Sequence, residues 1–285
     1  MQTGTVPFED LLPQVDQEQI ASILTKLNAV AQECVTRTVH ENSVLTYSAG
    51  IDSSILAELL RRQLGEVSLL TIGRVESSDV RVVSQDPLAR SKGFHFVLEN
   101  IDVKAIEEAA IQVSKIVTVS NLSHFEDCVS FWLAASAGNR IKDLHYILSA
   151  NGPDELFCGY DRFRRIVDEQ GYPAAEMEIM KALDSAEKLR KQVAVVVSKF
   201  GYETCEPFLE NEFKEYSLTI PVEYKILKGN DILRKRIWRC FGRSLGVPSS
   251  TVVRQKKAMQ YGMGVHAVVL SMVKKDRIDI ESKTA

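Results

Sequence analysis

Short apolar runs alternate with segments of helical spacing along the first half of the chain. The apolar runs predict buried strands at residues 43–47, 67–72, 94–98 and 144–148. The helical spacing predicts helices over residues 13–40, 55–64, 103–117 and 125–142. Because such alternation is typical of parallel sheets, the pattern favours an α/β fold whose sheet is covered by helices on both faces.

The second half of the chain has a mostly helical pattern. Apolar spacing there predicts helices over residues 174–200 and 229–245. We therefore expect two parts of one unit. The first is an α/β core over residues 1–169, which begins with a helical lead-in, and the second is a mostly helical part over residues 170–285.

Basic residues cluster on the helix predicted over residues 229–245. The same helix carries Leu233, Ile237 and Phe241 on its other side, so we interpret the basic side as a solvated polar face. Nucleic-acid binding is the alternative, but no aromatic stacking platform interleaves with the charges. The basic residues are Arg234, Lys235, Arg236, Arg239 and Arg243.

The composition is that of an ordinary globular protein. Of its 285 residues, 45% are hydrophobic and 26% are charged, which excludes disordered, collagen-like and coiled-coil proteins. The 35 Lys and Arg residues against 38 Asp and Glu residues give a net charge of −3. The chain therefore has no overall basic field for holding nucleic acid, and we expect no such partner.

Cysteine usage and hydropathy indicate a cytoplasmic protein. The five cysteines include no Cys-x-x-Cys pair, which argues against a disulfide scaffold or a zinc ribbon and favours free thiols in a reducing compartment. No apolar run approaches the roughly 20 residues of a membrane helix. The opening Met1-Gln2-Thr3-Gly4 does not begin a signal peptide. We expect no membrane partner.

A loop of small residues follows the first predicted strand and leads directly into a helix. Its backbone N–H groups and the positive end of the helix would form a nest for phosphate. Asp52 fits such an anion site only with a cation between it and the phosphates, which implies Mg²⁺. The alternative is that Asp52 or Ser53 merely caps the helix. The loop is Ser48-Ala49-Gly50-Ile51-Asp52-Ser53-Ser54.

A second polar loop follows the fourth predicted strand. Its position would place Asp154 at the same sheet edge as Asp52, where the two carboxylates could share Mg²⁺. An ordinary strand-to-helix turn, with Asp154 and Glu155 favoured by the helix dipole, is the alternative. The loop reads Ser149-Ala150-Asn151-Gly152-Pro153-Asp154-Glu155.

Both loops resemble motifs of one enzyme family. The first is similar to the Ser-Gly-Gly-x-Asp-Ser pyrophosphate loop of the N-type ATP pyrophosphatases. Residues 149–160 are similar to the Ser-Gly-Glu-Gly-x-Asp-Glu-Leu-Phe-Gly-Gly-Tyr segment of the asparagine synthetases within that family. With later matches at 201–210 and 245–262, the likeness runs from about Glu41 to about Val265. It implies a Rossmann-like parallel sheet of the adenine nucleotide α-hydrolase type with a mostly helical C-terminal part.

The resemblance also implies an activity, that of an ATP-dependent amidoligase. The β-carboxylate of aspartate would attack the α-phosphate of ATP, pyrophosphate would leave, and ammonia would convert the acyl-adenylate into asparagine and AMP. Lys256 would steady the charge on the α-phosphate, with Lys257 as the near alternative. Magnesium would lie between Asp52 and Asp154.

The resemblance carries over to individual residues at the nucleotide site. Asn151 and Lys256 are the candidate catalytic residues. The candidate ATP- and pyrophosphate-binding residues are Ser48, Ala49, Gly50, Ile51, Asp52, Ser53, Ser54, Ile72, Ser149, Ala150 and Gly152.

Three positions depart from the family pattern. Ala49 stands where the family has a Gly, and alanine tolerates positive φ poorly. Asn151 stands where many members have a Glu that assists amine deprotonation, and an amide cannot act as a general base. Cys205 replaces an Arg.

The chain shows no glutaminase-like set of residues, so ammonia would come from solution or from a separate glutaminase subunit. Aspartate and ammonia would be the small-molecule partners, and a homo-oligomer stays open. Three other functions also stay open: an adenylating enzyme with another acceptor or amine, a non-catalytic ATP-binding scaffold, and a tRNA-modifying ATP pyrophosphatase.

Overall fold

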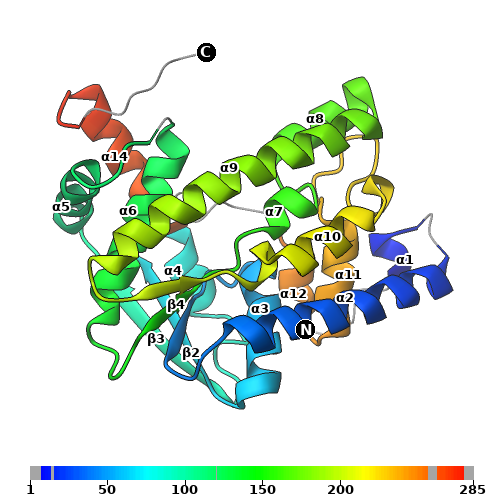
Figure 1. Ribbon diagram of the computed structural model, residues 1–285, viewed down its shortest axis with the longest axis horizontal. Coiled ribbons are helices and arrows are strands. Elements are labelled where there is room, and N and C mark those ends of the chain that lie inside the picture. Colours follow the sequence, from blue (N-terminus) through cyan, green and yellow to red (C-terminus); the bar gives the residue numbers. More distant parts are fainter. Residues whose placement is uncertain (1–7, 14–15, 120, 256–261, 279–285) are drawn as a thin grey trace.

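Five parallel strands form one sheet in the order β3-β2-β1-β4-β5. The computed structural model describes residues 8–13, 16–119, 121–255 and 262–278 (Figure 1). The strands are β1 (Ser43–Thr46), β2 (Val67–Gly73), β3 (Phe94–Asn100), β4 (Tyr146–Leu148) and β5 (Glu203–Cys205). The predicted parallel α/β sheet is confirmed, and β5 is a fifth strand at its edge that the apolar pattern did not predict.

Helices make up most of the remaining chain. Those of the first part are α1 (Phe8–Leu11), α2 (Gln17–Thr38), α3 (Ile51–Leu64), α4 (Ser78–Val83), α5 (Val103–Ser114), α6 (Leu122–Gly138), α7 (Pro153–Leu156) and α8 (Asp161–Gln170). Those that follow are α9 (Tyr172–Ser198), η1 (Pro207–Leu209), α10 (Asn211–Thr219), η2 (Val222–Tyr224), α11 (Arg236–Ser244), α12 (Ser249–Val252) and α14 (Val265–Lys274). The boundary predicted at residue 170 falls at the end of α8, and the division into two parts stays a prediction.

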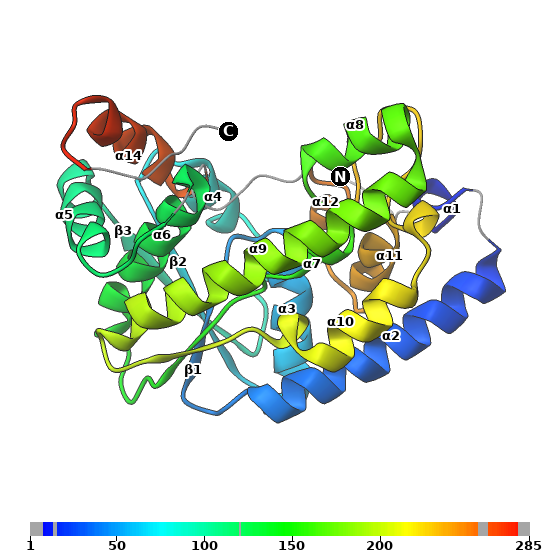
Figure 2. The same cartoon turned by 45° about the horizontal axis from the view of Figure 1, so that its top comes forward.

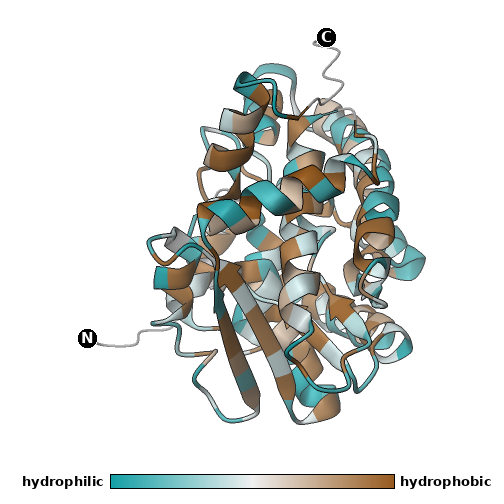
Figure 3. Cartoon of the chain, turned by 90° about the vertical axis from the view of Figure 1, so that its left-hand side faces the viewer, coloured by the Kyte–Doolittle hydropathy of each residue, from teal (hydrophilic) through white to brown (hydrophobic). Residues whose placement is uncertain are grey.

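Apolar side chains alternate between the two faces of the sheet, because neighbouring residues of a strand point to opposite sides. Leu45 and Leu69 belong to a core that also contains residues of α2, α3 and α11. Val44 and Leu70 belong to the second core, with α5, α6 and α14. Figures 1 and 2 show α5, α6 and α14 gathered on one side of the molecule and α2, α10 and α11 on the other. The strands themselves are largely apolar (Figure 3).

The helix predicted from residue 229 begins only at Arg236, so this prediction of its start is wrong. The Asp231 carboxylate accepts the backbone N–H groups of Leu227, Leu233 and Arg234, which bends the preceding segment into a loop. Arg234 and Lys235 have left-handed φ values of 51° and 50°, a conformation that a helix of L-residues cannot contain.

The interpretation of the basic cluster as a solvated face is also wrong for three of its members. Arg234 is 7% exposed, and Lys235 and Arg239 are fully buried. Buried charges are costly unless they are paired and hydrogen-bonded, so each of these side chains must have partners. None of the helices that the structure describes could span a membrane.

Truncation of a central strand residue should destabilise the fold. Ile147 of β4 is fully buried, so we expect Ile147→Ala to lower the free energy of unfolding by about 2–5 kcal/mol. Met177→Ala on α9 is the control, because Met177 is 66% exposed. Urea unfolding of both variants tests this, and equal losses would contradict the proposed packing of the sheet.

Candidate active site

A cavity of about 230 Å³ opens at the carboxyl ends of the strands. The loops that follow β1 and β4 form two of its walls, which is where ligands bind in open parallel sheets. Residues from α4, α11 and the segment after α12 complete it. The lining residues are Thr46, Ser48, Gly50, Ile51, Asp52, Ser53, Asp79, Val82, Ser149, Ala150, Asn151, Asp154, Arg239, Arg254 and Gln255.

The first loop presents the N-terminus of α3 to this cavity. Gly50 is the capping residue and offers no side chain, so the alternative that Asp52 or Ser53 caps the helix is wrong. The Ser48 hydroxyl accepts the Gly50 N–H at 3.3 Å and lies 3.3 Å from the Ser53 hydroxyl. Ala49 has a φ of 53°, so the loop does adopt the conformation that alanine tolerates poorly.

Lys235 forms ion pairs with both acidic residues of the cavity, Asp52 and Asp154, from their buried side. Its Nζ lies 2.6 Å from Asp52 Oδ2 and 2.7 Å from Asp154 Oδ1. The Lys235 side chain is fully buried, whereas Asp52 and Asp154 are 15% and 14% exposed and line the cavity. Two carboxylates that would repel each other are thereby held together, and the three groups together carry one negative charge.

Two further contacts fix this ion triad. The Trp238 indole N–H donates to Asp52 Oδ1 at 2.8 Å, and the Trp238 ring stacks on Phe157 with 4.9 Å between ring centroids. Gly159 packs so closely that a Cβ there would lie 2.0 Å from Asp154 Oδ1 and 2.2 Å from Lys235 Cε. Only glycine leaves room for the triad at this position.

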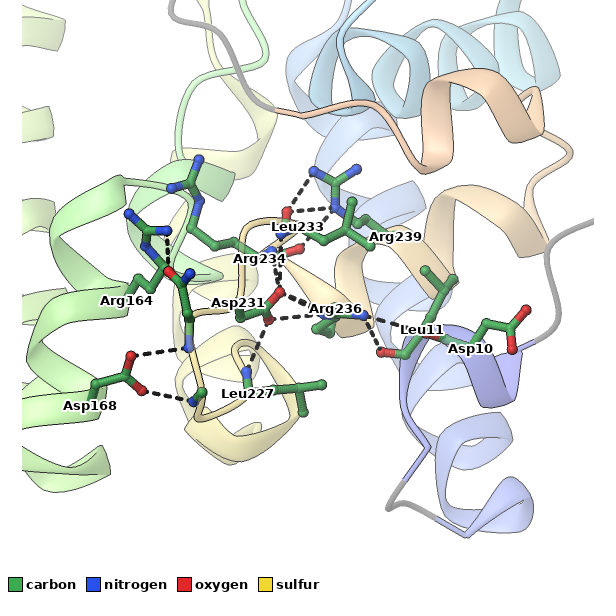
Figure 4. A network of polar contacts seen from close by, with 12 residues as sticks. Asp10, Leu11, Arg164, Asp168, Leu227, Asp231, Leu233, Arg234, Arg236 and Arg239 are labelled. Carbon is green, nitrogen blue, oxygen red and sulfur yellow. Dashed lines mark hydrogen bonds and ion pairs between the residues drawn. The ribbon is translucent and has the colours of Figure 1, made fainter.

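The loop that carries Lys235 is fastened at its centre by Asp231 (Figure 4). In addition to the three backbone N–H groups, Asp231 accepts from the Arg236 guanidinium, with the closest contact at 2.6 Å. The Arg236 guanidinium also donates hydrogen bonds to the backbone carbonyl oxygens of Asp10 and Leu11. Burial alone would raise the pKa of Asp231, but the bonds from Arg236 and from backbone N–H groups outweigh it and hold that pKa below its ordinary value.

Arg239 clamps the Lys235 loop to the wall formed by the segment after α12. Its guanidinium donates to the carbonyl oxygens of Leu233 and Arg234 on one side, and of Val252 and Arg254 on the other. Burial lowers the pKa of Arg239 to about 10, but it stays a cation at neutral pH. Arg254 in turn donates to the carbonyl oxygen of Ala49 in the first loop.

A second polar pair lies where β4 and β5 end side by side. The Asn151 carboxamide Nδ2 donates to Glu206 Oε1 at 2.8 Å, and Arg190 Nε lies 3.3 Å from Glu206 Oε2. Glu206 is 2% exposed. Burial raises the pKa of Glu206, while the Asn151 hydrogen bond and the Arg190 charge act in the opposite direction.

The structure brings most of the predicted site residues together around the cavity. Asp52 and Asp154 share one sheet edge, as expected, and Ile72 lines a narrower hollow of about 20 Å³ that shares Thr46, Ser48 and Asp79 with the cavity. Lys256 and Lys257 lie outside the described residues. The predicted residues that line the main cavity are Ser48, Gly50, Ile51, Asp52, Ser53, Ser149, Ala150, Asn151 and Asp154.

Three predicted residues do not line the cavity but support its loops. Ala49 and Ser54 belong to the first loop, but both are fully buried. Gly152 has a φ of 110°, and a Cβ there would lie 2.7 Å from the Phe208 carbonyl oxygen, so only glycine allows this close approach.

Sequence reasoning missed Lys235, Trp238, Arg239 and Glu206. The Trp238 ring is buried in the core, and no sequence pattern shows that its N–H group donates to Asp52. The helical spacing predicts a solvated face for Lys235 and Arg239 because it runs without a break through the Asp231 loop. Glu206 offered one signal, an acidic residue flanked by apolar and proline neighbours just before a buried Pro-Phe-Leu run.

The residues at the cavity fit magnesium. Carboxylate oxygens are the ligands this ion prefers, both acids line the cavity, and Lys235 approaches them from the buried side. The triad keeps one negative charge for a cation. Asp52 and Asp154 are thus the residues that would hold it.

Comparison with known proteins identifies the family. Residues 26–199 match the family model described as asparagine synthase. The chain belongs to the asparagine synthase family. A protein of Methanocaldococcus jannaschii named as a glutamine-hydrolysing asparagine synthetase is 28% identical over 259 residues, covering 80% of this chain and 47% of that protein. The Homo sapiens asparagine synthetase is 26% identical over 267 residues, covering 90% of this chain and 46% of the relative.

The chain therefore spans about half the length of the family members it matches. Among solved structures, an NH3-dependent NAD synthetase from Campylobacter jejuni is similar with a TM-score of 0.35 and 18% identity, covering 71% of this chain and 97% of that one.

The stability supplied by Asp231 should depend on pH. Its folded-state pKa lies below the ordinary 3.8, so its contribution is complete above that pH and is lost as the pH falls through the lower folded-state value. We expect Asp231→Asn to cost about 3–5 kcal/mol near neutral pH, because it leaves the Arg236 charge unpaired. The difference from the unsubstituted protein should shrink in acid, as measured by urea unfolding across pH. A difference that is constant with pH would contradict this, and exposed Asp184→Asn is the control.

Removal of the Lys235 charge should leave two facing carboxylates without their counter-ion. We expect Lys235→Met to cost about 3–5 kcal/mol. We also expect Mg²⁺ alone to raise the melting temperature of this variant more than that of the unsubstituted protein, because the cation relieves the repulsion. Differential scanning calorimetry with and without Mg²⁺ measures both effects. Lys181→Met, at an exposed position of α9, should respond like the unsubstituted protein, and equal Mg²⁺ responses in all three would refute the role of the triad.

Proposed function

We propose that the protein is an ATP-dependent amidoligase that adenylates the β-carboxylate of aspartate and transfers the acyl group to ammonia, giving asparagine, AMP and pyrophosphate. The observation that carries the proposal is the single cavity in which the Ser48–Ser53 loop faces Asn151 and Asp154. A loop that could hold phosphate, two acids that could hold Mg²⁺ and an uncharged polar group meet there. Membership of the asparagine synthase family supports the same chemistry.

In this proposal the ATP phosphates lie at the N-terminus of α3. The N–H groups of the first helical turn have no partner within the helix and favour an anion. The adenine ring would lie beside the phosphates at the mouth of the neighbouring hollow, whose apolar lining includes Leu70, Ile72, Phe131 and Met263. The hollow itself, at about 20 Å³, is too small to enclose the ring.

The first step is attack of the substrate carboxylate on the α-phosphate, with pyrophosphate as the leaving group. Magnesium held by Asp52 and Asp154 would supply counter-charge to the leaving pyrophosphate. Lys235 keeps these two acids at a fixed separation, and Arg239 and Arg254 line the same cavity as fixed cations. Lys256, which follows the lining residue Gln255, is the proposed cation for the charge that develops on the α-phosphate.

In the second step the amine nitrogen forms a bond to the acyl carbon, and the bond from that carbon to the phosphate oxygen breaks. The nitrogen loses a proton to a phosphate oxygen of the departing AMP or to water. Ammonia would be free or would come from a separate glutaminase subunit. A different amine or carboxylate is the second candidate, because Asn151 cannot remove a proton as an acid residue could.

Product analysis distinguishes these functions. With ATP, Mg²⁺, aspartate and ammonium, we expect mass spectrometry to detect asparagine and AMP in equal amounts. Asp52→Asn should lower the rate at least about a hundredfold, since it weakens both the cation site and the triad. Asp184→Asn, an exposed substitution on α9, should not change it.

Other outcomes would redirect the proposal. AMP formation that requires another carboxylate or amine would favour the second candidate. Formation of ADP, or tight ATP binding without any turnover on a panel of carboxylates and amines, would contradict the amidoligase proposal.

A further inference from the structure

The acid nearest to Asn151 is not in the cavity wall but directly behind it. Asn151 lines the cavity, whereas Glu206 is 2% exposed and is not among the lining residues. Nδ2 of Asn151 donates to Glu206 Oε1 at 2.8 Å. The carboxylate thus holds the nitrogen end of the carboxamide, and Oδ1 is the end that Glu206 does not hold.

The geometry around this pair is rigid. Leu148 and Cys205 face each other in the parallel pairing of β4 and β5, and the Ser149 N–H donates to the Cys205 carbonyl oxygen at 3.0 Å. Asn151 follows β4 by three residues and Glu206 follows β5 by one. The tight contact between Gly152 and the Phe208 carbonyl oxygen presses the two turns together.

Glu206 is paired with a positive charge that reaches the surface. Arg190 Nε lies 3.3 Å from Glu206 Oε2, and Arg190 Nη2 lies 3.1 Å from Glu210 Oε1. A guanidinium stays protonated at every physiological pH. Burial raises the pKa of Glu206, and the Arg190 charge opposes that shift and so favours the carboxylate form behind the cavity wall.

An amide in front of a carboxylate can serve an attacking amine in two ways. The amine must keep its lone pair for the acyl carbon, so its N–H groups need acceptors, which a carboxamide oxygen supplies. A carboxylate one layer back also stabilises the positive charge that develops on nitrogen during attack.

We propose that Glu206 is a positioning residue for the amine step: it fixes the Asn151 carboxamide so that Oδ1 accepts an N–H of the attacking amine, and its charge stabilises the developing ammonium. This inference rests on the proposed amidoligase function. It assigns Asn151 and Glu206 to the second half-reaction, and it leaves the first half-reaction to the Ser48–Ser53 loop and the Lys235 triad. The proton leaves with AMP or water, because Glu206 has no direct access to the cavity.

The two half-reactions can be measured separately. Aspartate-dependent exchange of labelled pyrophosphate into ATP reports adenylation without an amine, and asparagine formation with ammonium reports both steps. For Glu206→Gln we expect exchange within about twofold of the unsubstituted protein. We expect asparagine formation to fall about ten- to hundredfold, with a higher KM for ammonium and an unchanged KM for ATP. Glu203→Gln, an exposed acid of β5 three residues away, is the matched control and should change neither measurement.

A double substitution tests whether the pair acts as one carboxylate and one amide. Asn151→Glu alone places two acids side by side and should lower amide formation. Asn151→Glu combined with Glu206→Gln exchanges the carboxylate and the amide. We expect this double variant to form the amide at least about tenfold faster than Glu206→Gln alone. A merely structural role for Glu206 would not give this recovery.

The outcomes separate the two proposals. Exchange and asparagine formation that fall together in Glu206→Gln, or a double variant without recovery, would overturn the inference and leave the amidoligase proposal intact. Absence of both exchange and amide formation in the unsubstituted protein with every carboxylate and amine would refute the amidoligase proposal and this inference with it. Thermal melting of each variant shows that it is folded.

Discussion

The candidate site depends on one buried cation. Lys235 reaches between Asp52, at the start of α3, and Asp154, at the start of α7, and so ties together two segments that are about a hundred residues apart in the chain. Without a positive charge there, Coulomb repulsion in a poorly solvated region would push the acids apart or protonate one of them. The relative position of the two cavity loops therefore follows from an electrostatic requirement as much as from the strand pairing of β1 with β4.

Lys235 is held in place by contacts of its own loop, in addition to its ion pairs with Asp52 and Asp154. The Asp231 carboxylate accepts three backbone N–H groups and the Arg236 guanidinium (Figure 4). Arg239 donates to carbonyl oxygens of the loop and of the segment after α12. Most of these contacts involve backbone groups, whose positions do not depend on side-chain rotamers. The loop can therefore keep Lys235 in a left-handed backbone conformation that would otherwise be unfavourable.

The sequence made the sheet and the two cavity loops predictable because each depends on local patterns. Four strands show as apolar runs, and the loops show as small and acidic residues directly after them. Lys235 could not be found in this way, since its burial depends on a turn that Asp231 creates and that helical spacing does not reveal. β5 has only three residues, too few to give a pattern, and Glu206 directly after it is equally unmarked by a strand or helix pattern. Local sequence patterns therefore do not reveal the long-range pairings between charged groups.

Gly159 links this electrostatic arrangement to how the protein can change over evolutionary time. A single methyl group at that position would overlap both Asp154 and Lys235, so no side chain can be introduced there while the ion triad persists. We therefore expect residue 159 to change only after Lys235 or Asp154 has itself been replaced. In a relative that lacks either charged partner, this steric limit is absent and residue 159 is free to carry a side chain.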